Sequence, residues 1–155
     1  MKKLMIAISL LILTAIAFVW LFPAQALKAE FARQRWLAGA EVRTQQVDGE
    51  RWHFLEAGQG PLIVLVHGYT GSKENWLPVI GKLAEKHRVI AVDLPGWGES
   101  SRMPDEDYGL RAQARRVRAF VGALGLPNTH VVGHSMGGAI AGTYAAHYGG
   151  RVATL

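Results

Sequence analysis

A long apolar run opens the chain and sets its first residues apart from the rest. Residues 4–22 carry no charge and show no polar face. As a helix rising about 1.5 Å per residue, this run would cross the roughly 30 Å hydrocarbon core of a bilayer. Lys2 and Lys3 precede it, as in exported chains. We therefore expect a membrane anchor with the body in the periplasm, although cleavage after the small-x-small triplet that ends at Ala26 would release a secreted protein.

A basic segment separates this run from the body of the protein. The stretch LKAEFARQRWLA, residues 27–38, has the composition of a helix rich in basic side chains. Two interpretations stay open for it: a solvated linker helix, or a helix that lies on lipid headgroups. The expected organisation is an anchor or signal segment over residues 1–26, a basic linker helix over 27–40, and a folded body over 41–155.

The body alternates strand-like and helix-like patterns. Residues 62–66 and 88–92 are short apolar runs, as expected of strands buried on both faces. Asp48-Gly49 predicts a tight hairpin turn. Strands are predicted at 41–46, 50–56, 62–66, 88–92 and 130–132, and helices at 77–87, 110–124 and 137–147. This alternation predicts an α/β fold built on a mostly parallel sheet with helices on both faces.

One predicted helix has a clear apolar face. Its apolar positions step by three and four residues, at Leu110, Ala114, Val117, Val121 and Leu124. We expect this face to pack on the sheet. Three arginines fall on the opposite side, where solvent is the expected surrounding: Arg111, Arg115 and Arg118.

Composition and charge exclude several classes of protein. The 155 residues are 50% apolar and contain no cysteine, which excludes a disordered chain, a disulfide scaffold and a thiolate metal site. The formal net charge is +5, and Lys2 and Lys3 contribute two of these charges. The remainder is small and scattered, so we expect no nucleic-acid partner.

The strongest chemical signal is GHSMGG, residues 133–138, between a predicted strand and a predicted helix. This is the context of a nucleophile elbow, in which Ser135 sits on a sharp turn with its hydroxyl exposed. Gly133 and Gly137 would leave room where strand and helix cross, and Gly138 would let the helix approach closely. The helix N-terminus favours negative charge that develops near the serine.

A second turn, HGYTG at residues 67–71, directly follows the first buried strand. In a parallel sheet it lies at the carboxyl edge, where sites form. The main-chain N–H of Tyr69 could there join that of Met136 in an oxyanion hole. For His67 we expect a structural hydrogen-bonding role rather than that of a base. We expect a supporting role for His134, because neighbouring side chains diverge on so sharp a turn.

A third turn, DLPGWGES at residues 93–100, follows the second buried strand. Asp93 precedes Ser135 in the chain, against the order of serine, acid and histidine expected for this class of triad. We therefore expect Asp93, like Gly68, to support the loops of the site. Trp97 either lines a pocket or packs inside the fold, and the sequence leaves both open.

These turns together resemble the α/β-hydrolase superfamily. Residues 67–76, 93–101 and 133–141 are similar, in order, to its three N-terminal signatures, and the resemblance extends over 41–155. The most similar members are membrane-anchored bacterial serine esterases and lipases. The resemblance implies the α/β-hydrolase fold, Ser135 as nucleophile, and no metal or cofactor.

The same resemblance implies an activity and a gap. The activity is hydrolysis of carboxylic esters, including lipid esters, through an acyl-enzyme on Ser135, with Tyr69 and Met136 as main-chain oxyanion donors. No acidic residue follows Ser135, and His147 is the only later histidine, inside the predicted elbow helix. We therefore expect the triad acid and histidine to lie outside these residues, and the fold to stop after the elbow helix in an incomplete sequence.

Other functions of the same fold remain open at this point. Carbon–carbon bond hydrolases and serine haloperoxidases also use a serine elbow, whereas epoxide hydrolases and dehalogenases carry aspartate there. An inactive, membrane-tethered remnant is the non-enzymatic alternative.

Overall fold

The computed structural model describes residues 1–125 and 129–154. The chain divides into two compact units, Met1–Gln34 and Arg35–Leu155. The second unit carries the sheet and every candidate site residue, so the two units are described separately.

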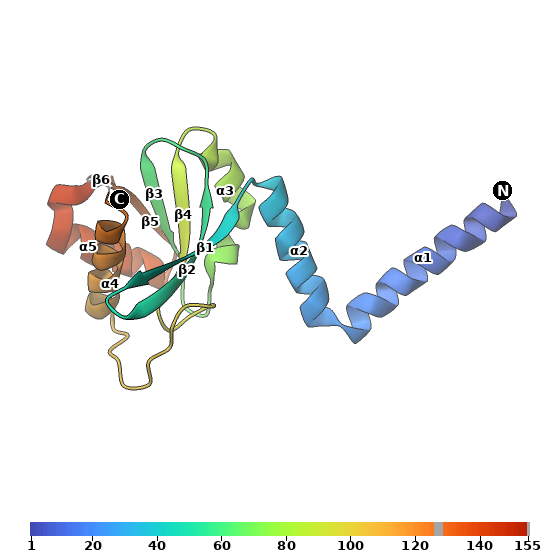
Figure 1. Ribbon diagram of the computed structural model, residues 1–155, viewed down its shortest axis with the longest axis horizontal. Helices are drawn as coiled ribbons and strands as arrows, with labels where there is room; N and C mark the ends of the chain where they lie inside the picture. The colour runs from blue at the N-terminus through green and yellow to red at the C-terminus, as the bar shows by residue number, and fades with distance from the viewer. Residues whose placement is uncertain (126–128, 155) are drawn as a thin grey trace. The chain divides into compact units, whose positions relative to one another are not determined.

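The N-terminal unit consists of helices (Figure 1). Helix α1 (Lys2–Leu21) has the length and composition to cross a membrane, and none of it is buried. Phe22 breaks the helix with φ −132° and ψ 57°, because a residue before proline is driven out of the helical region. Helix α2 (Pro23–Leu37) therefore begins earlier than the predicted linker helix at 27–38, with proline at its favoured first position.

In the part of the chain that the structure describes, the body holds a six-stranded sheet in the order β1-β2-β4-β3-β5-β6. The strands are β1 (Glu41–Val47), β2 (Glu50–Ala57), β3 (Leu62–Val66), β4 (Arg88–Asp93), β5 (Thr129–Gly133) and β6 (Val152–Thr154). Strand β2 pairs antiparallel with β1 and β4, and every other pair is parallel. The parallel strands bring the ends of β3, β4 and β5 to one edge of the sheet.

The predicted hairpin turn is confirmed. Asp48 and Gly49 both adopt positive φ, 49° and 82°, between the paired residues Val47 and Glu50. Two successive positive φ values are what a two-residue turn of this hand requires, and Asp-Gly accommodates them at low cost.

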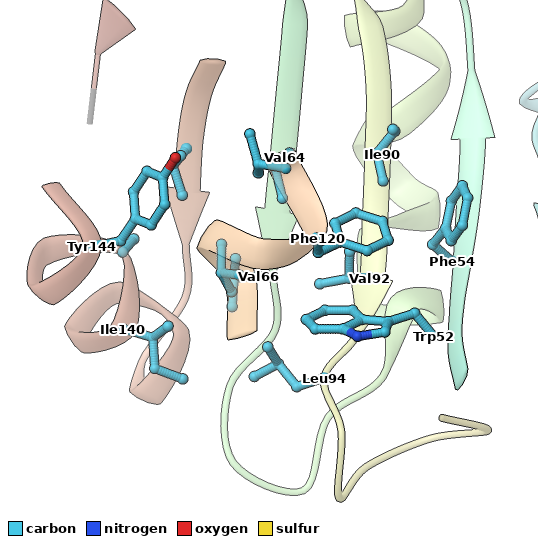
Figure 2. Packing of buried hydrophobic residues seen from close by; sticks show 14 of the residues in the cluster. Trp52, Phe54, Val64, Val66, Ile90, Val92, Leu94, Phe120, Ile140 and Tyr144 are labelled. Carbon is cyan, nitrogen blue, oxygen red and sulfur yellow. The ribbon is translucent and has the colours of Figure 1, made fainter. Parts of the chain in front are cut away.

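Helices cover both faces of the sheet, as predicted (Figure 2). They are α3 (Leu77–Ala84), α4 (Leu110–Ala123) and α5 (Met136–Tyr148), with short 3₁₀ turns η1 (Lys73–Trp76) and η2 (Gly149–Arg151). Alternate sheet residues such as Val64 and Ile90 join α4 and α5 in one core, in which Phe120 stacks on Trp52 with ring centroids 4.6 Å apart. The strand residues that alternate with Val64 and Ile90 point to the opposite face of the sheet, on which α3 packs.

Helix α3 is shorter than predicted. It ends at Ala84, whereas the pattern predicts a helix over 77–87. The N–H groups of Lys86 and His87 both turn back to the carbonyl of Leu83. The chain has to reverse here, because β4 begins at the next residue and runs in the opposite direction to the helix.

The apolar face of α4 is confirmed except at its start. Ala114, Val117 and Val121 are buried, but Leu110 is 44% exposed. The first turn of the helix packs instead through Gln113. Its side-chain N–H donates a 2.8 Å hydrogen bond to the carbonyl of Pro95, in the loop after β4. This turn lies over a polar loop rather than over the apolar sheet, so leucine gains no burial there.

Candidate active site

Ser135 occupies a strained turn between β5 and α5. Its backbone has φ 54° and ψ −120°, a region that residues with a side chain rarely adopt. The turn is held by its own helix, because Gly138 and Ala139 donate their N–H groups to the Ser135 carbonyl at 2.9 and 3.2 Å. The serine itself is exposed. Such a combination of strain and exposure is typical of functional positions.

Two glycines allow the strand and the helix to touch through their main chains. A Cβ added to Gly133 would overlap the carbonyl of Gly137. A Cβ added to Gly137 would overlap the carbonyls of Val66 and His67 at the end of β3. Any side chain at either position would push α5 away from the sheet and displace Ser135.

The loop after β3 lies against the serine. A Cβ added to Gly68 would stand 3.1 Å from the Cβ of Ser135, so the main chain at Gly68 lies directly beside the serine side chain. Among the residues that the structure describes, the main-chain N–H groups of Tyr69 and Met136 have no hydrogen-bond acceptor. One lies in this loop and the other at the start of α5, so both are available to a substrate oxygen.

A small pocket of about 160 Å³ lies at this junction. Its lining comes from the loop after β3, from η1 and from the elbow: Gly68, Tyr69, Thr70, Gly71, Asn75, His134 and Ser135. Thr70 has a positive φ of 58°, and the N–H of Gly71 closes the loop on the Gly68 carbonyl at 3.0 Å. A larger cavity of about 430 Å³ lies at the β1–β2 turn and α4 and does not include Ser135.

His67 is buried and uses both ring nitrogens inside the fold. The N–H of Leu94 donates to its Nε2 at 3.1 Å, so the ring proton is on Nδ1, which faces the Gly68 carbonyl at 2.8 Å. Burial lowers the pKa of His67, against the opposing influence of the Gly68 carbonyl. The ring is therefore neutral and unavailable to take a proton from Ser135.

The state of His67 predicts a pH dependence of stability. We expect the free energy of unfolding to fall as the pH drops below about 6.5, because unfolded His67 takes up a proton there and folded His67 does not. Asp93 and Glu74 favour the protonated ring and Lys73 opposes it, but burial dominates. Urea melts between pH 5 and 8 measure the slope. The His67→Gln variant should show a shallower slope, and parallel curves for the two proteins would contradict the prediction.

The other sequence candidates for a base or an acid do not reach the serine. In the part of the chain that the structure describes, no histidine or carboxylate hydrogen bonds to Ser135. His134 is exposed, and His147 turns its Nδ1 to a carbonyl of its own helix. Asp93 is fully buried among other partners. No group of three or more His, Asp or Glu side chains in the described ranges is arranged to hold a metal ion.

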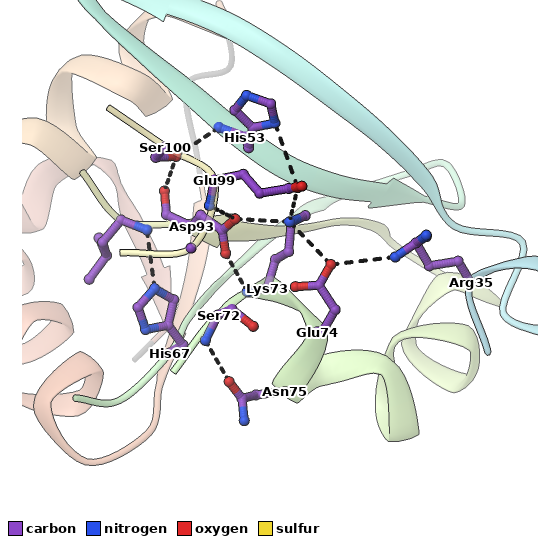
Figure 3. Close-up of polar contacts among 12 residues, drawn as sticks. Arg35, His53, His67, Ser72, Lys73, Glu74, Asn75, Asp93, Glu99 and Ser100 are labelled. Atoms are coloured by element: carbon purple, nitrogen blue, oxygen red, sulfur yellow. Dashed lines mark hydrogen bonds and ion pairs between the residues drawn. The ribbon is translucent and has the colours of Figure 1, made fainter. Parts of the chain in front are cut away.

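Asp93 belongs to a buried ion-pair network around Lys73 (Figure 3). Lys73 is 1% exposed, and its Nζ lies 2.9 Å from Asp93 Oδ2, 2.7 Å from Glu99 Oε2 and 3.1 Å from Glu74 Oε1. Burial alone would lower the pKa of Lys73, but hydrogen bonds to Glu99 and Asp93 outweigh it and raise the pKa. The hydrogen bond from Lys73 likewise lowers the pKa of Glu99. The Lys73 ammonium and the Glu99 carboxylate are therefore both charged near neutral pH.

No signal in the sequence singles out Lys73. Its immediate neighbours Ser72, Glu74 and Asn75 are all polar, so they give no sign that Lys73 is buried. Its partner Asp93 is 20 residues away. Only the meeting of two loops at the sheet edge brings them together.

Trp97 both packs and lines a pocket. Its ring centroid lies 6.3 Å from that of His67, 6.4 Å from that of Tyr69 and 5.9 Å from that of Tyr108. With Tyr108 and Met103 it also lines a surface pocket of about 400 Å³. The Tyr69 ring is 72% exposed, so this aromatic group reaches from the core to the mouth of the site.

Comparisons with known proteins identify the fold family. A family model described as "alpha/beta hydrolase fold" matches residues 61–155. Monoacylglycerol lipase ABHD6 of Bos taurus is 32% identical over an alignment of 155 positions, which covers 96% of this chain and 45% of that protein. Bifunctional epoxide hydrolase 2 of Sus scrofa is 40% identical over 106 residues, covering 67% of this chain and 19% of that protein.

A solved structure extends the likeness over nearly the whole chain. The crystal structure of a membrane phospholipase A, described as a bacterial virulence factor, is 37% identical with a TM-score of 0.81 and covers 98% of this chain and 50% of its own. The chain thus spans about half the length of this phospholipase and of the bovine lipase. Because the family model covers more than half of the chain and the fold agrees, the protein is a member of the α/β-hydrolase family.

Proposed function

We propose that this protein is a serine hydrolase that cleaves carboxylic esters of acyl lipids. The observation that carries the proposal is the position of Ser135, exposed on a strained strand-to-helix turn beside the free N–H groups of Tyr69 and Met136. A nucleophile next to two unpaired main-chain donors is the arrangement that acyl transfer needs.

In the proposed reaction, the Ser135 oxygen attacks the ester carbonyl carbon and passes its proton to a histidine. The carbonyl oxygen becomes negatively charged and accepts hydrogen bonds from the main-chain N–H groups of Tyr69 and Met136. Removal of either donor lowers the rate of such a reaction about 100-fold or more. The alcohol leaves with the proton, and the acyl group stays on Ser135. Water then attacks this acyl-enzyme by the same route and releases the acid.

In this proposal, the histidine and its acid partner come from a part of the fold that lies outside the described residues. No described histidine or carboxylate hydrogen bonds to Ser135. The related lipase and phospholipase are about twice as long as the matched region. Activity is therefore a property of the complete protein.

The choice of ester over epoxide rests on the residue at the elbow. One relative is a bifunctional epoxide hydrolase. Epoxide hydrolases of this fold carry an aspartate at the elbow, where this chain has Ser135. The lipid class is supported by relatives named as a monoacylglycerol lipase and a membrane phospholipase A, and by the apolar helix α1.

Labelling with a fluorophosphonate tests the proposal on the complete protein. These reagents react with serines that are activated as nucleophiles, so we expect one labelled peptide, which contains Ser135. Ser135→Ala should abolish labelling. The matched control is Ser101→Ala, because the Ser101 hydroxyl hydrogen bonds to the main chain of Arg51 and does not line the pocket at Ser135. Labelling should persist in this variant. Labelling that survives in Ser135→Ala would overturn the assignment.

We also propose that α1 anchors the protein in a membrane with its body on the periplasmic side. The complete protein should then stay with membranes through a wash in roughly 1 M salt, because salt screens charges but leaves apolar burial intact. Detergent should release it, and a chain that begins at residue 27 should be released without detergent. A mature N-terminus at Leu27 in the native protein would indicate a cleaved signal instead.

Protease access tests the orientation of the body. In bacterial cells whose outer membrane has been opened, an added protease should digest the folded body. A body that stays intact until the inner membrane is lysed would place it in the cytoplasm.

A further inference from the structure

Two loops meet at the candidate site and are joined by buried polar contacts. The first, residues 67–76, follows β3 and contains Tyr69. The second, residues 93–101, begins with Asp93, the last residue of β4. The N–H of Leu94 donates to His67 at the start of the first loop, at 3.1 Å. The second junction lies at the far end of the first loop, where Asp93 meets Lys73.

The Asp93 carboxylate uses both oxygens on this junction (Figure 3). Oδ1 accepts the main-chain N–H of Lys73 at 2.6 Å. Oδ2 accepts the Lys73 ammonium and the main-chain N–H of Glu99, each at 2.9 Å. Gly98 packs so tightly on this carboxylate that a Cβ there would overlap it. Asp93 therefore holds the main chain of Lys73 in one place and has no freedom to move.

A short path of covalent and hydrogen bonds leads from Lys73 back to Tyr69 in the first loop. Ser72 caps η1 and donates its N–H to Asn75 Oδ1 at 2.6 Å. Asn75 itself lines the pocket beside Ser135. A Cβ on Gly71 would come within 2.9 Å of that Asn75 oxygen, and the Gly71 N–H closes the turn that contains Tyr69. A shift of the Lys73 main chain would thus be transmitted to the Tyr69 N–H.

We infer that Asp93 and Lys73 are positioning residues for the oxyanion hole: their buried ion pair fixes the end of the first loop and so aims the Tyr69 N–H at the site of negative charge. The inference rests on the proposed serine hydrolase function. A buried ion pair is a poor source of net stability, because desolvation of both charges offsets their attraction. Its value here is geometric, since an oxyanion donor misplaced by a fraction of an ångström loses its effect on the transition state.

Asp93→Asn tests the inference in the complete protein. The amide keeps one oxygen, and in either orientation its NH₂ faces a donor. That donor is the Lys73 main-chain N–H on one side, or the Lys73 ammonium and the Glu99 N–H on the other, so the junction has to open. We expect kcat for a p-nitrophenyl ester to fall about 10- to 100-fold, while KM stays within about twofold, because the donor acts on the transition state more than on the bound ester. The rate constant for fluorophosphonate labelling of Ser135 should fall in parallel.

A second variant keeps the test informative if Asp93→Asn does not fold. Lys73→Met removes the ammonium but leaves both main-chain N–H groups on the Asp93 carboxylate. We expect the same direction of change with a smaller loss in kcat, less than about 10-fold.

The matched control is Glu50→Gln. Glu50 pairs with Arg116 at 2.8 Å, both side chains are 12% exposed, and neither lines the pocket of Ser135. This variant also loses a shielded ion pair, so urea melts can match its loss of stability to that of the Asp93 variant. Its kcat should equal that of the wild type.

The outcomes separate the inference from the function on which it rests. If wild-type protein is not labelled, the proposed function fails. If wild-type protein is labelled and folded Asp93→Asn, or Lys73→Met in its place, reacts at the wild-type rate, the positioning role is overturned. A loss seen only in KM, or an equal loss in Glu50→Gln, would also overturn it, because either result reduces the network to general stability.

Discussion

The Ser135→Ala variant of the complete protein should hydrolyse a short-chain p-nitrophenyl ester about 1000-fold more slowly in kcat/KM than the wild type, or slower still. Without the hydroxyl no acyl-enzyme can form, and only the oxyanion donors and substrate binding remain to accelerate attack by water. Initial-rate kinetics over a range of ester concentrations measure the loss. A variant that keeps even a tenth of the wild-type kcat/KM would show that another residue is the nucleophile.

The strained backbone of Ser135 supplies an internal control for this experiment. Alanine at φ 54° is as strained as serine, so Ser135→Ala should melt close to the wild type. Ser135→Gly should be equally inactive but more stable by about 1 kcal/mol or more, because glycine adopts positive φ without strain. A Ser135→Gly protein that is less stable than Ser135→Ala would contradict the strain that the backbone shows.

Gly137→Ala should destabilise the protein by about 3 kcal/mol or more and remove activity with it. The added methyl group would overlap the carbonyls of Val66 and His67. These are main-chain atoms at the end of the central strand β3, and they have little room to move. Helix α5 would have to shift, taking Ser135 and the Met136 N–H out of position. Urea melts of the two proteins measure the difference in free energy of unfolding.

Gly142→Ala is the matched control on the same helix. A Cβ at Gly142 meets nothing within 4 Å, and its φ is not in the left-handed region. We expect this variant to be as stable as the wild type or up to about 1 kcal/mol more stable, because alanine is the better helix former. Equal effects of the two substitutions would mean that helix propensity, and not the main-chain crossing, governs position 137.

Much of the fold could be predicted from local pattern. The apolar runs at 62–66 and 88–92 are β3 and β4, and Asp48-Gly49 forms the predicted hairpin turn. These features are local, because a few consecutive residues determine whether a segment can be buried or can turn back. The prediction was wrong where tertiary context decided, as at Leu110 and at the end of α3, which the chain's reversal into β4 shortens.

The candidate site divides in the same way. The glycine spacing around Ser135 marks the sharp turn in the sequence itself, because only residues without a side chain tolerate so close a crossing of strand and helix. The hydrophobic pattern does not predict the order of the strands in the sheet. Strand β4 lies between β2 and β3, although β3 precedes it in the chain. That order is what sets the loops after β3 and β4 next to each other.

The sequence by itself therefore determined the family, most of the elements and the serine at the elbow. Only the tertiary structure decided the state of the charged groups around them. Lys73 lies in a polar stretch, and Asp93 ends an apolar strand 20 positions later. Each would be costly to bury alone. They are buried because two loops converge at one sheet edge and let each neutralise the other, and a pairing across that distance leaves no trace in local hydrophobic periodicity.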